Sequence, residues 1–275
     1  MTTTFGKTLK KFIYGNIPYA WYKIFEPQSP LLNYYRYLKE NGYTHYPYEF
    51  AEKYLHMPVE IKKDETNGLF YVKHRGGDKR LYYPRRYTKA AIEKNYRALL
   101  IEQDINHPHH YVDSFDELEG KILLDIGSAE GFTSLDGIEK IKFAYLFEFE
   151  QDWIEALQAT FKPWTNKVLI VDKYVGKSST EISVSLNDFF KDKPKDNLFL
   201  KMDIEGAECE ALEGAELLFN EATNLHFAIC TYHKRNDKKQ IASYLEAHHC
   251  SYSVRKGFMY VKHRLRPAII HGNKI

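Results

Sequence analysis

The sequence predicts an α/β protein with a doubly wound, mostly parallel sheet of seven strands over residues 120–275, preceded by a helical and β-hairpin extension over residues 1–119. From Lys121 onward, short apolar runs alternate with helical patterns, which indicates parallel strands joined by helices. The first run, KILLDIGSAEGFTSL, passes from a buried strand through a glycine turn into a helix. Ligands of open α/β sheets bind at such turns.

The composition is that of an ordinary globular protein, with 44% hydrophobic residues, 28% charged residues and a net charge of +2. This near-neutral balance gives no drive toward nucleic acid, so we expect no nucleic-acid partner. Cys209, Cys230 and Cys250 form no CxxC pair, which argues against a disulfide framework and a zinc knuckle. No stretch is long and apolar enough for a transmembrane segment or a secretory leader, so we expect a cytoplasmic protein.

The front of the chain predicts two helices. Phe5, Leu9, Phe12 and Ile13 recur at helical spacing among lysines, which indicates a short basic amphipathic helix that ends at Pro18. Such a helix can lie on a membrane surface, but we favour packing as a cap on the domain. A second helix begins near Leu31 and ends near Asn41-Gly42.

Residues 69–84 predict a β-hairpin around Gly76-Gly77-Asp78. Its basic tip includes Arg75, a candidate contact for an anionic substrate, although such a tip is usually only solvated. A helix over residues 88–101, capped by Thr88, leads into a histidine-rich loop over residues 102–114. This loop is either a polar connector or a substrate lip to which His109 contributes.

The glycine turn has the spacing Asp125-x-Gly127-x-x-x-Gly131, which differs from the G-x-G-x-x-G of dinucleotide sites. Asp125 and Glu130 flank it, so their charges disfavour a pyrophosphate and favour a cation. S-adenosylmethionine carries a sulfonium and an ammonium group and no phosphate, and it is therefore the expected cofactor. Further candidate contacts from the same turn are Ser128 and Phe132.

Polar residues follow the other predicted strands at the same edge of the sheet. Glu148 ends the second strand about twenty residues after the turn, where a carboxylate can accept the ribose hydroxyls of an adenosine. Asp172, after the third strand, is a candidate for the adenine edge. Three charged residues at the end of the fourth strand are candidate site residues: Lys201, Asp203 and Glu205.

His233 stands just past the fifth strand and could accept a proton from a hydroxyl. After a further helix, residues 252–255 and 258–262 predict an antiparallel hairpin that closes the sheet. Seven strands that end in such a hairpin fit the class I methyltransferase variant of the doubly wound fold better than a dinucleotide-binding domain. The basic tail RLRPAIIHGNKI is expected to pack back on the domain.

Several blocks resemble the FkbM-type S-adenosylmethionine-dependent methyltransferases over about residues 120–262: DIGSAEG, FEFEQ, VDKYVG, SLNDFF, KMDIEGAECEALEGAE and TYHKRND. The resemblance implies an O-methyltransferase that acts on a sugar or another metabolite hydroxyl. It implies that Asp125, Gly127 and Gly131 hold the methionine end of the cofactor, Glu148 the ribose, and that Asp203 lies beside the methyl group.

Many members of this family carry Glu-x-His after the fifth strand, whereas this chain reads Thr231-Tyr232-His233 and lacks the glutamate. We expect His233 to act as general base and Asp203 to orient it or the acceptor. A divalent ion held by Asp203 with Glu205 or His109 is a weaker variant.

Two other functions stay open at this point: a nicotinamide-dependent oxidoreductase on the same kind of sheet, and a non-enzymatic interaction module with a degenerate cofactor site. The acceptor is expected to be a small molecule or a glycan. A homo-oligomer is compatible with the sequence.

Overall fold

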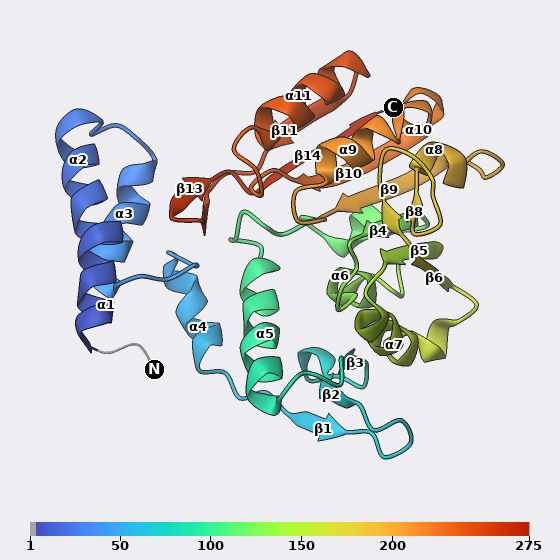
Figure 1. Ribbon diagram of the computed structural model, residues 1–275, viewed down its shortest axis with the longest axis horizontal. Coiled ribbons are helices and arrows are strands. Elements are labelled where there is room, and N and C mark those ends of the chain that lie inside the picture. The colour runs from blue at the N-terminus through green and yellow to red at the C-terminus, as the bar shows by residue number, and fades with distance from the viewer. Residues whose placement is uncertain (1–3, 275) are drawn as a thin grey trace.

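The computed structural model describes residues 4–274, and its centre is a seven-stranded sheet in the order β11-β14-β10-β9-β4-β5-β6 (Figure 1). The parallel strands are β4 (Ile122–Ile126), β5 (Phe143–Glu148), β6 (Val168–Asp172), β9 (Asp196–Met202) and β10 (Thr223–Cys230). At one edge, β14 (Ile269–Lys274) runs antiparallel to both β10 and β11 (Ser251–Val254). The predicted fold class, the class I methyltransferase arrangement, is confirmed.

The predicted closing hairpin is wrong in its second strand. β11 pairs with β14, which lies in the tail, while β12 (Met259–Val261) pairs with β13 (Arg264–Arg266) in a separate two-stranded sheet. The reason is burial: Ile269 and Ile270 are fully buried, and they belong to the clusters on opposite faces of the sheet. The tail therefore supplies the apolar pair that the sheet edge needs.

Helices cover both faces of the sheet, because alternate residues of each central strand point to opposite sides. Leu123 of β4 belongs to one core cluster with α5 (Lys89–Glu102), α6 (Phe132–Asp136) and α7 (Gln151–Thr160). Leu124 belongs to the other, with α8 (Leu186–Phe189), α9 (Glu208–Glu213), α10 (Glu216–Glu221) and α11 (Asp237–Ala247). A separate two-stranded sheet is formed by β7 (Tyr174–Val175) and β8 (Ser183–Val184).

The predicted hairpin and the predicted helix after it both form. β2 (Phe70–Lys73) pairs with β3 (Arg80–Tyr83), and β1 (Ile61–Lys63) adds a third antiparallel strand. The Thr88 hydroxyl caps α5 by accepting a hydrogen bond from the Ala91 amide at 3.2 Å. Buried residues of the hairpin share the core cluster of Leu123.

The first helical segment is longer than predicted. It comprises α1 (Thr4–Lys11), a π-helical turn (Phe12–Asn16) and α2 (Ile17–Phe25), and it is followed by α3 (Leu31–Asn41) and α4 (Glu52–Leu55). Pro18 does not end it, because it lies in the first turn of α2, where the missing proline N–H costs least. Figure 1 shows α1, α2 and α3 at one end of the molecule, beside β13.

The turn after β4 is packed against the end of β9 so closely that only glycine fits at residue 127. Gly127 has a φ of +76°, and a Cβ added there would lie 1.9 Å from the Asp203 carbonyl oxygen. Gly120 has a similar φ of +67°, but a Cβ there would meet nothing within 4 Å. Both glycines therefore need a positive φ, but only Gly127 lacks the space for a side chain.

We expect Gly127→Ala to lower the free energy of unfolding by at least about 2 kcal/mol more than Gly120→Ala, because overpacking adds to backbone strain. Urea unfolding followed by circular dichroism measures both. Equal losses in the two variants would contradict the close contact between β4 and β9.

Candidate functional site

A cavity of about 820 Å³ lies at the carboxyl ends of β4, β5 and β9, where α5 and the loop after it form a further wall. Its volume is in the range of small-molecule and cofactor sites. The predicted site residues that line it are Asp125, Gly127, Ser128, Glu130, Phe132, Glu148, Lys201, Asp203, Glu205 and His109. Gly131, Asp172, Arg75 and His233 are not among its lining residues.

A buried ion pair supports the glycine turn. Lys201 Nζ lies 2.9 Å from Asp125 Oδ1 and donates a hydrogen bond to the Gly127 carbonyl oxygen at 2.6 Å. Burial alone would lower the pKa of Lys201, but the charges of Asp125 and Asp203 outweigh it and raise that pKa above its ordinary value. Lys201 is therefore a cation that ties β9 to the turn after β4.

Glu148 also organises the turn from the end of β5. Its carboxylate accepts hydrogen bonds from the backbone amides of Ala129 at 3.0 Å, Phe149 at 2.8 Å and Glu150 at 2.9 Å. Asp172 lies outside the cavity lining, exposed on β6, where it accepts a hydrogen bond from Gln151.

Two aromatic rings of the cavity wall were missed from the sequence. Phe149 and Tyr174 both line the cavity, with ring centroids 6.0 Å apart, and they are 58% and 40% exposed. Exposed rings at a cavity suit a flat ligand surface such as an adenine. The feature of the sequence that could have revealed Phe149 was its position directly after Glu148, the acidic end of the second predicted strand.

A cluster of rings surrounds the carboxylate of Asp203. The Tyr111 hydroxyl donates to Oδ2 at 2.8 Å and the Tyr232 hydroxyl to Oδ1 at 3.4 Å, while His109 Nε2 lies 3.5 Å from Oδ2. Burial would raise the pKa of Asp203, but His109, Lys201 and His233 outweigh it and hold that pKa well below its usual range. Asp203 is therefore ionised, which makes it a better acceptor of hydrogen bonds than of protons.

His109 comes from the loop after α5, and both of its ring nitrogens have polar neighbours. Nε2 lies 3.2 Å from the Tyr232 hydroxyl, and Nδ1 lies 3.5 Å from the side-chain amide of Gln103. With the proton on Nε2, facing Asp203, Nδ1 is left as an acceptor. Gln103, Tyr111 and Tyr232 all line the cavity, and sequence reasoning named none of them as site residues. The folded path of the loop brings Gln103 and Tyr111 to the cavity, whereas Tyr232 lies just past the end of β10.

His233 lies behind Asp203, between two carboxylates. Its Nδ1 is 2.8 Å from Glu208 Oε1 and its Nε2 is 3.4 Å from Asp203 Oδ1. Burial lowers the pKa of His233, but the two acids outweigh it and raise that pKa above the ordinary value. Glu208 is fully buried and accepts the backbone amides of Ile204 and Gly206, so it also holds the turn before α9.

The remaining two substrate candidates differ in position. The Glu205 side chain is 94% exposed at the cavity. Arg75 donates to both carboxylate oxygens of Asp136, at 2.7 Å each, and it holds the hairpin tip on α6. The structure therefore brings Glu205 to the cavity and leaves Arg75 outside its lining.

The lining is strongly acidic. Its acids are Glu102, Asp125, Glu130, Glu148, Glu150, Asp203 and Glu205, and within the described residues Lys201 is its one lysine or arginine. Burial raises the pKa of both Glu102 and Glu130, and each is hydrogen-bonded, to Tyr46 and to Asn95 respectively. This charge pattern fits a cationic ligand such as S-adenosylmethionine and disfavours the pyrophosphate of a dinucleotide.

Among residues 4–274, two groups of side chains come close enough together to be considered for a metal ion: His109, Asp203 and Cys230, and Asp203, Glu208 and His233. In the first, Cys230 is fully buried, and burial raises the pKa of its thiol well above the ordinary value. In the second, His233 meets its two carboxylates through opposite ring nitrogens. In both groups the side chains already have polar partners within the protein.

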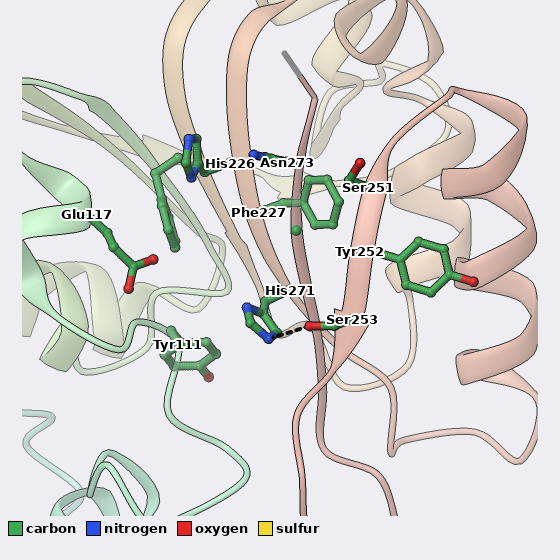
Figure 2. Close-up of a pocket in the computed structure, with 11 residues that line it drawn as sticks. Tyr111, Glu117, His226, Phe227, Ser251, Tyr252, Ser253, His271 and Asn273 are labelled. Atoms are coloured by element: carbon green, nitrogen blue, oxygen red, sulfur yellow. Dashed lines mark hydrogen bonds between the residues drawn. The ribbon is translucent and has the colours of Figure 1, made fainter.

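A second, shallower cavity of about 320 Å³ lies over β10, β11 and β14 (Figure 2). The figure shows the Ser253 hydroxyl bonded to His271, 2.8 Å from its Nε2, with Glu117 on the opposite side. None of the predicted site residues lines this cavity. The cavity beside β4 is therefore the candidate active site.

The strand order, the antiparallel β14 and the acidic glycine turn define the class I methyltransferase fold. A model of the Methyltransferase FkbM domain matches residues 24–254, which is most of the chain. The chain therefore belongs to the FkbM methyltransferase family. The match begins well before residue 120, where the resemblance in the sequence begins.

Two similar solved structures share little sequence identity with the chain. The chain is 18% identical to methyltransferase FkbM from Methylobacillus flagellatus KT, covering 68% of this chain and 56% of that one, with a TM-score of 0.47. It is 14% identical to magnesium protoporphyrin IX methyltransferase from Synechocystis PCC 6803, covering 69% of this chain and 86% of that one, with a TM-score of 0.44. The chain thus spans little more than half of the Methylobacillus protein. A search of curated proteins found no match.

The Lys201–Asp125 pair can be tested by a double-mutant cycle. Lys201→Met leaves the Asp125 carboxylate buried without its cation, so we expect it to lower the free energy of unfolding by about 3–5 kcal/mol. Adding Asp125→Asn removes the uncompensated charge and should restore much of the loss. Thermal and urea unfolding measure both variants, and strictly additive losses would show that the two side chains do not interact.

Proposed function

We propose that this methyltransferase transfers the methyl group to a hydroxyl of a sugar, a glycan or a related metabolite. The observation that carries the proposal is the ring of hydrogen-bonding groups around Asp203, which lies in the same cavity as the acidic glycine turn. Hydroxyl-rich acceptors need such donors and acceptors for orientation, and a hydroxyl must lose its proton during methylation.

The cofactor end of the cavity has the groups that S-adenosylmethionine requires. When bound, S-adenosylmethionine supplies a methyl group on a positively charged sulfur that departs as a neutral thioether. Asp125, Gly127, Ser128, Glu130, Gly131 and Phe132 form the turn proposed to receive its methionine end, and Glu148 the residue for the ribose hydroxyls. We propose Phe149 and Tyr174 for the adenine, in preference to Asp172, whose carboxylate is bound to Gln151.

His109 is our candidate for the group that accepts the proton of the acceptor hydroxyl. Its Nε2 faces the ionised Asp203, which would stabilise the imidazolium, and its Nδ1 would take the proton in place of the Gln103 contact. His233, the base expected from the sequence, is held between Glu208 and Asp203, which favours its protonated form. In this proposal His233 positions Asp203, and Lys201 and Glu205 remain candidates for contact with the acceptor.

The two other functions considered from the sequence have less support. An acidic lining opposes the phosphates of a nicotinamide dinucleotide. An interaction module does not need several buried charged groups around one cavity, because burying charge is costly without a function.

The proposal is tested by incubating the purified protein with S-adenosylmethionine and panels of sugars, nucleotide sugars and glycans. Mass spectrometry finds the methylated product, and nuclear magnetic resonance identifies the methylated atom. A methyl ether is expected. Methylation on nitrogen, carbon or sulfur would overturn the assignment of a hydroxyl acceptor.

With an acceptor in hand, we expect His109→Gln to lower kcat by roughly 100-fold or more, as for loss of a general base. Binding of S-adenosylhomocysteine, measured by calorimetry, should be retained. His233→Gln is the matched comparison, because a positioning residue affects turnover less than the base itself. If His233→Gln abolishes turnover and His109→Gln does not, His233 is the base.

Phe149→Ala should weaken S-adenosylhomocysteine binding roughly tenfold, the loss expected for one stacking contact with a base. Leu169→Ala is the control, because Leu169 is a similarly exposed apolar residue on β6 outside the cavity lining. Calorimetric titration with NADH in parallel tests the nicotinamide alternative. Unchanged affinity in Phe149→Ala would remove this ring from the proposed adenine site.

A further inference from the structure

The helical segment Thr4–Phe25 presents an exposed apolar face. Its large apolar side chains are between 41% and 69% exposed, and they are Leu9, Phe12, Ile13, Ile17, Trp21, Ile24 and Phe25. Apart from two adjacent pairs, they recur every three or four residues along α1, the π-helical turn and α2, so they follow one side of the segment. This stripe, here called the outer face, is longer than the short helix predicted from the sequence.

The opposite side of the segment attaches it to the protein. Gly15 packs so closely on α3 that an added Cβ would lie 2.8 Å from the Leu38 backbone. Tyr22 stacks on Tyr35 with centroids 5.0 Å apart, and Tyr14 stacks on His263 at 4.4 Å. The usual order of a surface helix is therefore reversed: glycine and tyrosines face the protein, and the aliphatic residues and the tryptophan face outward.

The charges of the segment indicate what covers the outer face. Residues 4–25 contain Lys7, Lys10, Lys11 and Lys23 and no Asp or Glu, although the whole protein has a net charge of only +2. A second copy of this segment would bring like charges together. Anionic lipid headgroups complement the lysines, and the acyl region just below them accommodates the apolar stripe and the amphipathic ring of Trp21.

The segment has the character of a helix that lies along a bilayer and does not cross it. Among residues 4–274, no helix is long and apolar enough to cross a membrane. The lysines and the polar inner face would oppose insertion across the hydrocarbon core.

We propose that the segment Thr4–Phe25 lies in the headgroup region of a membrane that contains anionic lipids, with its outer face toward the acyl chains. The sequence favoured a cap on the domain over a membrane surface; the inner face does pack on α3, but the outer face is left for the bilayer. The site of methyl transfer would then operate at a membrane surface.

The test is flotation of the full-length protein with vesicles of phosphatidylcholine alone and of phosphatidylcholine with phosphatidylserine. We expect the protein to float with the anionic vesicles and to be released as salt is raised, because each lysine contributes roughly fivefold to binding. Failure to float with anionic vesicles would overturn the proposal, and so would equal binding to both vesicles.

Three variants sharpen this test. Trp21→Gln, Ile24→Gln and Phe25→Gln together should lower vesicle binding roughly tenfold or more, because three exposed apolar contacts are lost. Lys7→Gln with Lys23→Gln should remove most of the preference for anionic lipid. The control is Ile182→Ser with Leu217→Ser, which changes exposed apolar residues elsewhere and should bind normally.

Circular dichroism and thermal unfolding verify that each variant is folded. Binding that survives the triple substitution would overturn the proposal. Sedimentation equilibrium without lipid provides the other decisive result: a dimer that the triple substitution dissociates would show that the outer face joins two copies of the chain.

Discussion

The ion pair between Lys201 and Asp125 connects the two strands on which the candidate active site depends. Lys201 is on β9, which ends directly before Asp203, and Asp125 is on β4, which leads into the glycine turn. A buried pair adds little net stability compared with an apolar pair, so its value lies in fixing relative positions. The hydrogen bond from Lys201 to the Gly127 carbonyl oxygen and the close approach of Gly127 to the Asp203 backbone hold the same junction. The turn and the Asp203 carboxylate therefore keep a constant separation.

The charge distribution follows from the topology. Parallel strands end at one edge of the sheet, so the acids that follow β4, β5 and β9 converge on one cavity. Their mutual repulsion is limited by Lys201, by backbone amides around Glu148 and by burial that raises the pKa of Glu102 and Glu130. A ligand that brings positive charge relieves the remaining repulsion, whereas one that brings phosphates adds to it.

The parts of the fold and of the candidate site that depend on local sequence patterns could be predicted. The apolar run before Gly127 and the acidic ends of later strands identified the sheet and its ligand edge, and the resemblance identified the family. The strand Ile269–Lys274 was missed because its apolar part is short and its remainder is polar, and its burial comes only from pairing with distant strands. Arg75 and Asp172 were proposed from their place along the chain, but their side chains have nearby partners in Asp136 and Gln151. The positions of Tyr111, Gln103 and Tyr174 depend on the paths of loops, and the hydrophobic periodicity of a sequence gives no information about those paths.

Part of the cavity is built by residues outside the sheet. Six lining residues precede the first strand of the seven-stranded sheet: Asn95, Leu99, Glu102, Gln103, His109 and Tyr111. Tyr46, which comes earlier in the extension, donates a hydrogen bond to Glu102. The glycine turn and this wall are thus separate stretches of sequence, which the hydrogen bond from Asn95 to Glu130 joins beside the cavity. Evolution can therefore remodel the wall beside His109 without changing the residues of the glycine turn. Exchange of residues 89–113 between members of the family would show whether this wall sets acceptor preference.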